Sequence, residues 1–360
     1  MFIITNRVVN EEETGLDAFG KEPNPAGPNE LRIVEVTGTT QFKVNVLADK
    51  LKQTEVEALV EKYKLTIDVN KPWYASLSVA CELFTRAIDE EKQILLFVHG
   101  YNNDIKDVLR TANELEELYD VIVVPFSWPA NGGGKVSGTA AYLSDKDDAR
   151  SSATALHRTV QKVQYYHQLL TENVKENFLQ EALDRHPDNR ELAQALFTRN
   201  MEQRCKATLN LLCHSMGNYV LKYASKPGNS SLRGLVFDNI GLVAADANNP
   251  GHESWVQSLP TRNRLYVVIN ENDSALKWSR RKPGDEQKER LGQHLRNLSA
   301  SNAYYIDITR NRGVGGEHSY FKAKTVNANS TLKRIFMRIF EGGKAEQALT
   351  YHSDINVYRS

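Results

Sequence analysis

From residue 91 onward, uninterrupted apolar runs alternate along the chain with amphipathic stretches. A short continuous apolar run is typical of a parallel strand buried on both faces, and apolar residues at helical spacing predict a helix. The predicted strands are 94–98, 121–126, 208–213, 240–245, 265–269 and 304–308, and the predicted helices are 104–118, 216–224, 274–281 and 329–341. Strands interleaved with helices predict an α/β fold, with a mainly parallel central sheet and helices on both faces.

The residues before position 91 follow a different pattern. Residues 1–30 open with a short β-prone run, but the prolines and glycines that follow it predict an extended surface segment or a hairpin. Two antiparallel strands and two helices are predicted after it, at 31–36, 42–47, 54–63 and 74–90. We therefore expect residues 1–90 to form an N-terminal extension whose hairpin and helices join the sheet.

One stretch interrupts the alternation of strands and helices. Residues 144–206 contain no predicted strand, and Leu156, Val160 and Val163 recur there at helical spacing among many charged residues. Two or three charged helices are expected, forming an insertion over the edge or mouth of the sheet. The α/β region then spans 91–345, and residues 346–360 are expected to be a C-terminal tail.

The charge balance narrows the range of partners. Lys and Arg together number 45, as do Asp and Glu, so the formal net charge of the 360 residues is zero. A general basic field of the kind that binds nucleic acid or an anionic membrane is therefore absent. We expect neither partner, and we expect the apolar stripe of residues 329–341 to pack in the core.

Other classes of site are also disfavoured. The three cysteines form no Cys-x-x-Cys pair, and no His/Cys spacing is typical of a metal site, so neither a disulfide framework, a metal nor another cofactor is expected. No apolar stretch has the length of a signal-peptide core or a membrane span, which favours a cytoplasmic location. The mixed charges of residues 277–290 predict a solvated surface.

The sharpest chemical motif is a serine at a predicted strand-to-helix turn. The run Cys213-His214-Ser215-Met216-Gly217 follows an apolar strand and precedes a helix. A serine in such a turn projects its Oγ above the sheet, provided that small residues flank it, and the helix N-terminus favours negative charge beside it. Gly217 satisfies one small position, whereas Cys213 occupies the other, where glycine is usual. Ser215 is the predicted nucleophile.

A second motif lies at the end of an earlier strand. The strand at 94–98 runs into His99-Gly100-Tyr101. In a sheet with a nucleophile turn, the amide after such a glycine and the amide after the nucleophile form an oxyanion hole, here the amides of Tyr101 and Met216. His99, Gly100 and Trp128 are expected to line the pocket.

A serine nucleophile needs a histidine base and a carboxylate that orients it. In this architecture the chain order is Ser, then Asp or Glu, then His. Asp273 follows the predicted strand 265–269, and His318 follows the last strand within a glycine-rich loop. Asp273 and His318 are therefore the predicted acid and base.

Other residues stay open for these two roles. Asp246 also follows a predicted strand and remains an alternative acid, with Glu271 as a third choice. His252 and His294 are rival bases, but neither follows a predicted strand, so solvated surface positions are expected for both. His214 adjoins the nucleophile and is expected to make a structural contact.

Six motifs together resemble one family. They are LLFVHGYNND, FSWPANG, CHSMGNYVL, LVAADANNP, NENDSALKWS and GEHSYF. This combination is similar to the DUF900 group of uncharacterised bacterial α/β-hydrolases over about residues 93–322. The resemblance implies an α/β-hydrolase fold and places Ser215, Asp273 and His318 at the triad positions, while residues 1–90 fall outside it.

The expected function is ester hydrolysis by acyl transfer. Ser215, His318 and Asp273 would act as a triad on a small-molecule acyl ester, with an acyl-enzyme intermediate. The alternative is a non-catalytic protein of the same fold that binds a ligand or partner; the Cys213 departure and the charged insertion favour this reading. The acyl group, the leaving group and the oligomeric state are not predicted.

Overall fold

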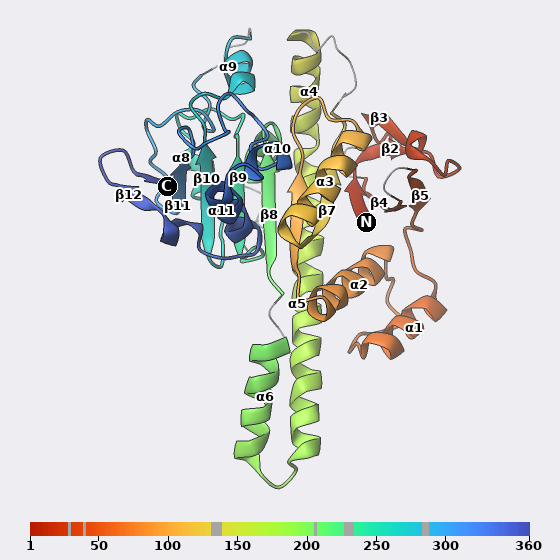
Figure 1. The fold of residues 1–360 in the computed structure, drawn as a ribbon. Helices are drawn as coiled ribbons and strands as arrows, with labels where there is room; N and C mark the ends of the chain where they lie inside the picture. The colour runs from red at the N-terminus through yellow and green to blue at the C-terminus, as the bar shows by residue number, and fades with distance from the viewer. Residues whose placement is uncertain (28–29, 39–40, 131–138, 205–206, 227–233, 283–287) are drawn as a thin grey trace.

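The predicted parallel strands lie side by side in one large sheet (Figure 1). The structure is a computed structural model, and it describes the chain except residues 28–29, 39–40, 131–138, 205–206, 227–233 and 283–287. The central strands are β6 Gln93–Val98, β7 Val121–Ser127, β8 Leu209–His214, β9 Asn239–Val243, β10 Arg264–Ile269 and β11 Ala303–Asp307. All of them pair in parallel, in the order β7-β6-β8-β9-β10-β11. The mainly parallel α/β sheet predicted from the sequence is confirmed.

Helices cover both faces of this sheet because successive strand residues point to opposite sides. Leu95 and Phe97 of β6 pack in one core with α3 (Ile105–Tyr119) and α11 (Ser330–Phe340). Leu96 and Val98 pack in the other core with α7 (Gly217–Ala224) and the first part of α5 (Ala153–Arg185). Both faces of β6 are therefore buried.

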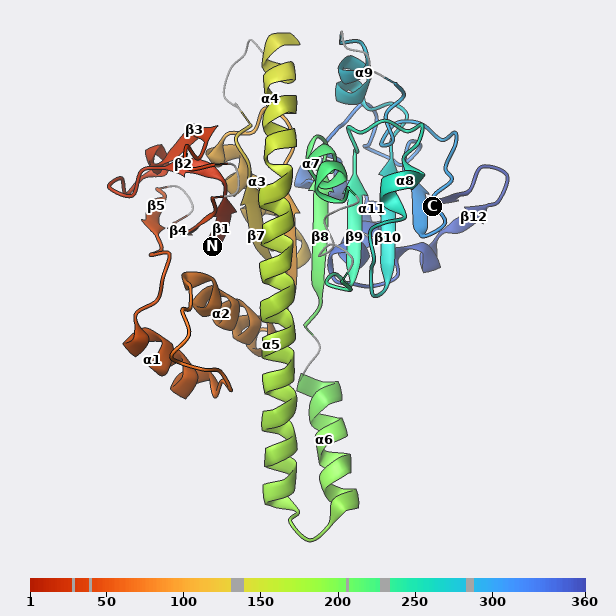
Figure 2. The same ribbon diagram turned by 180° about the vertical axis from the view of Figure 1, so that it is seen from behind.

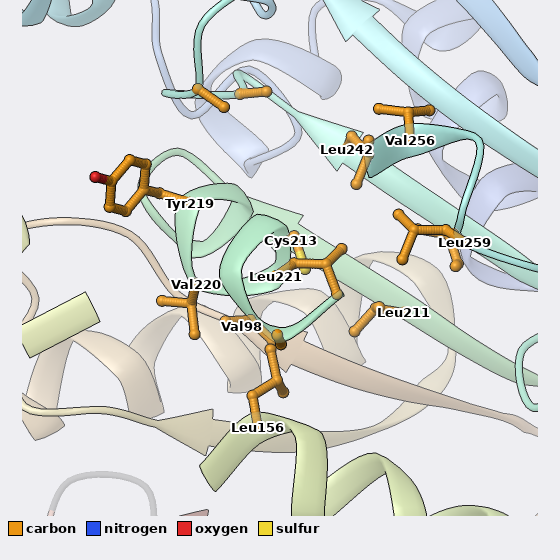
Figure 3. Close-up of a cluster of buried hydrophobic side chains, with 14 of the residues drawn as sticks. Val98, Leu156, Leu211, Cys213, Tyr219, Val220, Leu221, Leu242, Val256 and Leu259 are labelled. Atoms are coloured by element: carbon orange, nitrogen blue, oxygen red, sulfur yellow. The ribbon is translucent and has the colours of Figure 1, made fainter. Parts of the chain in front are cut away.

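The second core lies directly beneath the helix that follows the predicted nucleophile. Val220 and Leu221 of α7 pack over Leu211 and Cys213 of β8, and Leu156 of α5 approaches from the side (Figure 3). Cys213 has no exposed surface. The apolar contacts of α7 with the sheet thus fix the start of this helix, which lies just after Ser215.

The first residues of the chain are part of the sheet, whereas an extended surface segment or a hairpin was expected for residues 1–30. Strand β1 (Phe2–Thr5) lies between β7, to which it is parallel, and β4 (Arg32–Thr37), to which it is antiparallel. Ile3 is fully buried. This strand is the β-prone run seen in the sequence, and its pairing with β7 and β4 places it inside the sheet.

The rest of the N-terminal region follows the sequence prediction closely. Strands β4 and β5 (Lys43–Val46) form the predicted antiparallel pair and end the sheet. A separate hairpin and two helices complete the region: β2 Arg7–Val9, the 3-10 turn Leu16–Ala18, β3 Phe19–Pro23, α1 Gln53–Tyr63 and α2 Ala75–Asp89.

The predicted insertion consists of helices, as expected. They are α4 Thr139–Ser151, the 33-residue α5, and α6 Arg190–Arg204. The distal part of α5 and the whole of α6 form an antiparallel pair that projects away from the body of the molecule (Figures 1 and 2). Because α6 leads into the first residue of β8, this projection leaves the amino-terminal end of the strands and not the mouth of the sheet. Only α4 lies on the carboxyl-terminal side.

The expected C-terminal tail also differs in the structure. Residues 346–360 contain β12 (Thr350–His352) and β13 (Val357–Arg359), and β13 pairs in parallel with β11. Val357 is buried, and Arg359 forms an ion pair with Asp307. The two strands therefore extend the sheet beyond β11.

Shorter helices complete the described chain: α8 Glu253–Val256, α9 Ser274–Arg280, α10 Ala323–Val326 and the 3-10 turn Ala345–Ala348. Among the described residues, no helix combines the length and the apolar character needed to cross a membrane.

Candidate active site

Ser215 occupies a strained turn between β8 and α7. Its φ of 54° lies in the left-handed region, which a residue with a side chain seldom adopts. The turn is held by neighbouring strands: the Ser215 N–H donates to the Val243 carbonyl over 3.0 Å, and the Ser215 carbonyl accepts from the Asp246 N–H over 3.1 Å. The Asn218 side chain donates to the same carbonyl. These bonds stabilise a backbone conformation that presents the hydroxyl at the end of the sheet.

Two glycines allow the chain to approach Ser215 closely. A Cβ on Gly217 would lie 2.5 Å from the Val98 carbonyl oxygen, and a Cβ on Gly100 would lie 2.7 Å from the Cβ of Ser215. Atoms of this kind essentially never approach within 3.0 Å, so neither position accepts a larger residue without a shift. The end of β6 is thereby pressed against Ser215. Cys213, by contrast, is a buried strand residue that the core accommodates.

His99 stabilises the Gly100 turn that lies against Ser215. Its ring stacks on Trp128 with 5.2 Å between centroids, its Nε2 accepts from the Trp128 N–H, and its Nδ1 lies 3.0 Å from the Gly100 carbonyl. Burial, with a smaller contribution from Arg7, lowers the pKa of His99 to about 3, so the ring is neutral and Nδ1 donates. His99 and Trp128, expected to line the pocket, are instead buried beneath the Gly100 turn and hold it in place.

His318 and Asp273 meet across the end of the sheet. Nδ1 of His318 lies 2.7 Å from Oδ2 of Asp273, and the Asp273 side chain has no exposed surface. The other carboxylate oxygen of Asp273 caps α9 by accepting from the Leu276 N–H. The carboxylate is thus stabilised by a helix N-terminus and held toward His318.

The loop that carries His318 is fixed to the loop that carries Asp273. The Asn270 side-chain amide donates to the carbonyls of Gly315 and Glu317, and the Ser274 hydroxyl donates to the Gly316 carbonyl. The glycines of this loop therefore allow the backbone to pass close to the start of α9, where these hydrogen bonds hold it in one position.

His214 holds His318 from a second side. Its Nε2 lies 3.3 Å from the His318 carbonyl oxygen, and the two rings are 4.7 Å apart. Burial lowers the pKa of His214 well below its usual value, so the neutral ring donates from Nε2. His214 thus makes the structural contact expected of it. It links the segment that carries Ser215 to the backbone of His318.

The serine hydroxyl has no hydrogen-bond partner in the described part of the chain. Ser215 is 6% exposed, and its Oγ makes no hydrogen bond to any residue that the structure describes, His318 included. The Met216 N–H, at the start of α7, likewise donates to no described residue. The Tyr101 backbone directly follows Gly100, which lies against Ser215.

The alternative acid, Asp246, has different partners. Its Oδ1 lies 2.9 Å from Nε of Arg290 and 2.6 Å from the Ser279 hydroxyl, and its Oδ2 accepts from the Tyr142 hydroxyl. Asp246 and Arg290 are only 4% and 2% exposed. Arg290, at the end of a run expected to be a solvated surface, is therefore a buried counter-ion, and both Asp246 oxygens are bound away from a histidine.

The rival bases make other contacts too. His252, expected at a solvated surface, is fully buried, and its ring nitrogens contact the Tyr305 hydroxyl and the Asn249 carbonyl. The burial of His252 depends on residues such as Tyr305 that are distant in the sequence, so the local hydrophobic pattern does not indicate it. His294 is half-buried beside Arg280.

Sequence reasoning missed an aromatic cage next to the Gly100 turn. The rings of Tyr101, Tyr142 and Trp278 surround the ammonium of Lys282, whose nitrogen lies 3.0 Å from the Trp278 centroid and 4.0 Å from that of Tyr142. Burial lowers the pKa of Lys282 to about 8. The cage unites residues from three separate segments, so no local pattern could reveal it.

No group of three or more His, Cys, Asp or Glu in the described parts of the chain could hold a metal ion. The chemistry that the site offers is that of a serine beside a histidine–carboxylate pair.

The family model described as "Alpha/beta hydrolase of unknown function (DUF900)" matches residues 78–174. That segment includes the His99-Gly100-Tyr101 turn and ends before Ser215. None of the curated proteins and none of the solved structures matches this chain. The sheet order, the helices on both faces and the family match agree: the chain has an α/β-hydrolase fold, and its residues 78–174 are similar to the DUF900 family.

Proposed function

We propose that this protein is a serine hydrolase that cleaves carboxylic esters through an acyl-enzyme, with Ser215 as nucleophile, His318 as base and Asp273 as acid. The observation that carries the proposal is the 2.7 Å contact between His318 Nδ1 and the buried Asp273 carboxylate, at the same end of the sheet as the Ser215 turn. The partners of Asp246 favour Asp273 for this role.

The contact with Asp273 gives His318 the tautomer that catalysis needs. With the proton on Nδ1, Nε2 carries the lone pair that accepts the Ser215 proton. Ser215 Oγ then attacks the ester carbonyl carbon, and His318 returns the proton to the departing alkoxide. Water, deprotonated by the same nitrogen, releases the acyl group as a carboxylate.

Developing charge on the carbonyl oxygen would be stabilised by two backbone amides. The Met216 N–H lies at the amino end of α7, where the helix dipole favours an anion, and the Tyr101 N–H follows the glycine that abuts Ser215. The hydrogen bonds of His99 and Trp128 support this second amide by fixing the Gly100 turn.

A fluorophosphonate probe tests the nucleophile. We expect the unmodified protein to be labelled and Ser215→Ala to remain unlabelled. Ser258→Ala is the matched control, because Ser258 is an exposed serine on another loop and should be labelled like the unmodified protein. Equal labelling of the unmodified protein and Ser215→Ala would exclude Ser215 as the nucleophile.

A panel of p-nitrophenyl esters of increasing acyl length then defines the substrate class. One observation favours the alternative of a non-catalytic binding protein, namely the missing hydrogen bond between Ser215 Oγ and His318. Hydrogen bonds in a catalytic site often tighten only when substrate binds. Folded protein that neither reacts with the probe nor turns over any ester of the panel would support the alternative.

A further inference from the structure

A cavity of about 420 Å³ lies between the sheet and helices α2 and α5. Ile94 and Leu209, the second residue of β6 and the first of β8, line it. Ser215 follows the opposite, carboxyl-terminal end of β8. The cavity is therefore a separate space, at the other end of the strands from the candidate active site.

Its walls are mostly apolar. The sheet, α2 and α5 contribute aliphatic and aromatic side chains, which are Ile4, Ile33, Ile94, Leu96, Val124 and Leu209 from strands, Val79, Ala80, Leu83 and Phe84 from α2, and Val163, Tyr166 and Leu170 from α5. Several of them are only partly buried although the elements around them belong to the core. Protein interiors are close-packed, and a space of this volume is typical of small-molecule sites.

One face of α5 lines the cavity with charged residues at one end and with an aromatic and an aliphatic residue at the other. Arg158, Lys162, Tyr166 and Leu170 recur every four residues along that face, and all four line the cavity. Arg158 and Lys162 are exposed, whereas Tyr166 and Leu170 are buried. The helix thus places two cations at the entrance and apolar surface further in.

Other charged groups also line the cavity. Arg32 forms an ion pair with Glu30, and Asp49 is exposed. Burial, with a smaller effect of Arg262, lowers the pKa of His167 to about 4, so this ring is neutral near pH 7. The Lys162 ammonium lies over the Tyr74 ring at 4.7 Å, beside the entrance.

We propose that this cavity binds a fatty acid, with the aliphatic tail between α2 and the sheet and the carboxylate at Lys162. Apolar burial supplies the affinity, and the Lys162 ammonium selects an anionic head group. The site is independent of Ser215 and does not rest on the proposed hydrolase activity.

The first test measures charge selectivity on the unmodified protein. A dansylated undecanoic acid is bound, and dodecanoate or dodecyltrimethylammonium, each below its critical micelle concentration, is used to displace it. We expect dodecanoate to compete at least about tenfold better. No binding of the probe, or equal competition by the two amphiphiles, would overturn the proposal.

The second test locates the bound probe. Val163→Phe and Ala80→Phe fill the cavity from α5 and α2, and either folded variant should weaken binding by at least about tenfold. Leu179→Phe makes a similar change at an exposed position of the same helix and should bind normally, as should Ser215→Ala. Lys162→Met should reduce the preference for the acid over the corresponding alcohol probe. Binding lost in Ser215→Ala, or retained in both filled variants, would place the ligand elsewhere.

Discussion

His214 donates a hydrogen bond from Nε2 to the backbone carbonyl of His318 over 3.3 Å. The residue before the proposed nucleophile therefore positions the residue proposed as its base. We expect His214→Leu, which removes the donor, to lower kcat by about tenfold to a hundredfold with little change in KM, because a small displacement of His318 misaligns proton transfer.

His214→Gln is the conservative control, since its amide can donate to the same carbonyl. It should recover part of the lost kcat. If His214 had only a structural role, both variants would lower the thermal stability, but the folded protein would keep its full kcat. Steady-state kinetics and a thermal melting curve of each variant distinguish the two cases.

The two candidate acids should respond in opposite ways to removal of their charge. Asp273→Asn keeps the α9 cap but removes the anion that orients His318, so kcat should fall on the order of 10⁴-fold while stability changes little. Ester turnover and thermal unfolding of the same sample measure both effects.

Asp246→Asn is the matched variant. It removes the negative charge beside the buried guanidinium of Arg290, which should lower the free energy of unfolding by about 3–5 kcal/mol. Folded Asp246→Asn protein should retain most of its kcat. If turnover falls about as far in Asp246→Asn as in Asp273→Asn, the assignment of Asp273 is wrong.

The gathering of Ser215, Asp273 and His318 at one end of the sheet could be predicted from the sequence, because each of them follows a strand. The strands were visible as continuous apolar runs, and the order Ser215, Asp273, His318 then suggested which loops would meet. The choice between Asp273 and Asp246 could not be made this way. The proposal of Asp273 depends on the contact of Asp246 with Arg290, and Arg290 lies in a mixed-charge run typical of solvated surface.

The places of the shortest strands in the sheet were less predictable for a related reason. Strands β1, β12 and β13 have only three or four residues each, too few to show where a strand lies in the sheet. Strand β1 is held by β7, β13 by β11 and by the Arg359–Asp307 ion pair, and β12 by β13. Such positions are determined by partners distant in the sequence.

Gly100 should be required for the chemistry rather than for the fold alone. A methyl group there would press on Ser215 Cβ and Oγ, at 2.7 and 3.2 Å, so Gly100→Ala should displace the nucleophile and slow fluorophosphonate labelling by about tenfold or more. Gly15→Ala is the control, because a Cβ at Gly15 meets no atom within 4 Å. Normal labelling of folded Gly100→Ala would show that the end of β6 does not constrain Ser215.

The caged lysine predicts how stability depends on pH. Burial lowers the pKa of Lys282 from 10.5 to about 8 in the folded state, so between these values the unfolded chain binds more protons than the folded one. The free energy of unfolding should therefore rise with pH across this window, by up to about 1.4 kcal/mol per pH unit from this group. Below pH 8 the lysine is charged in both states, and the burial penalty is at its largest.

Urea unfolding of the unmodified protein and of Lys282→Met, at intervals from pH 7 to 10, isolates the effect because other groups titrate in both proteins. The stability of the unmodified protein relative to Lys282→Met should increase over this range, whereas a difference that stays constant with pH would show that the cage does not disfavour the charged ammonium.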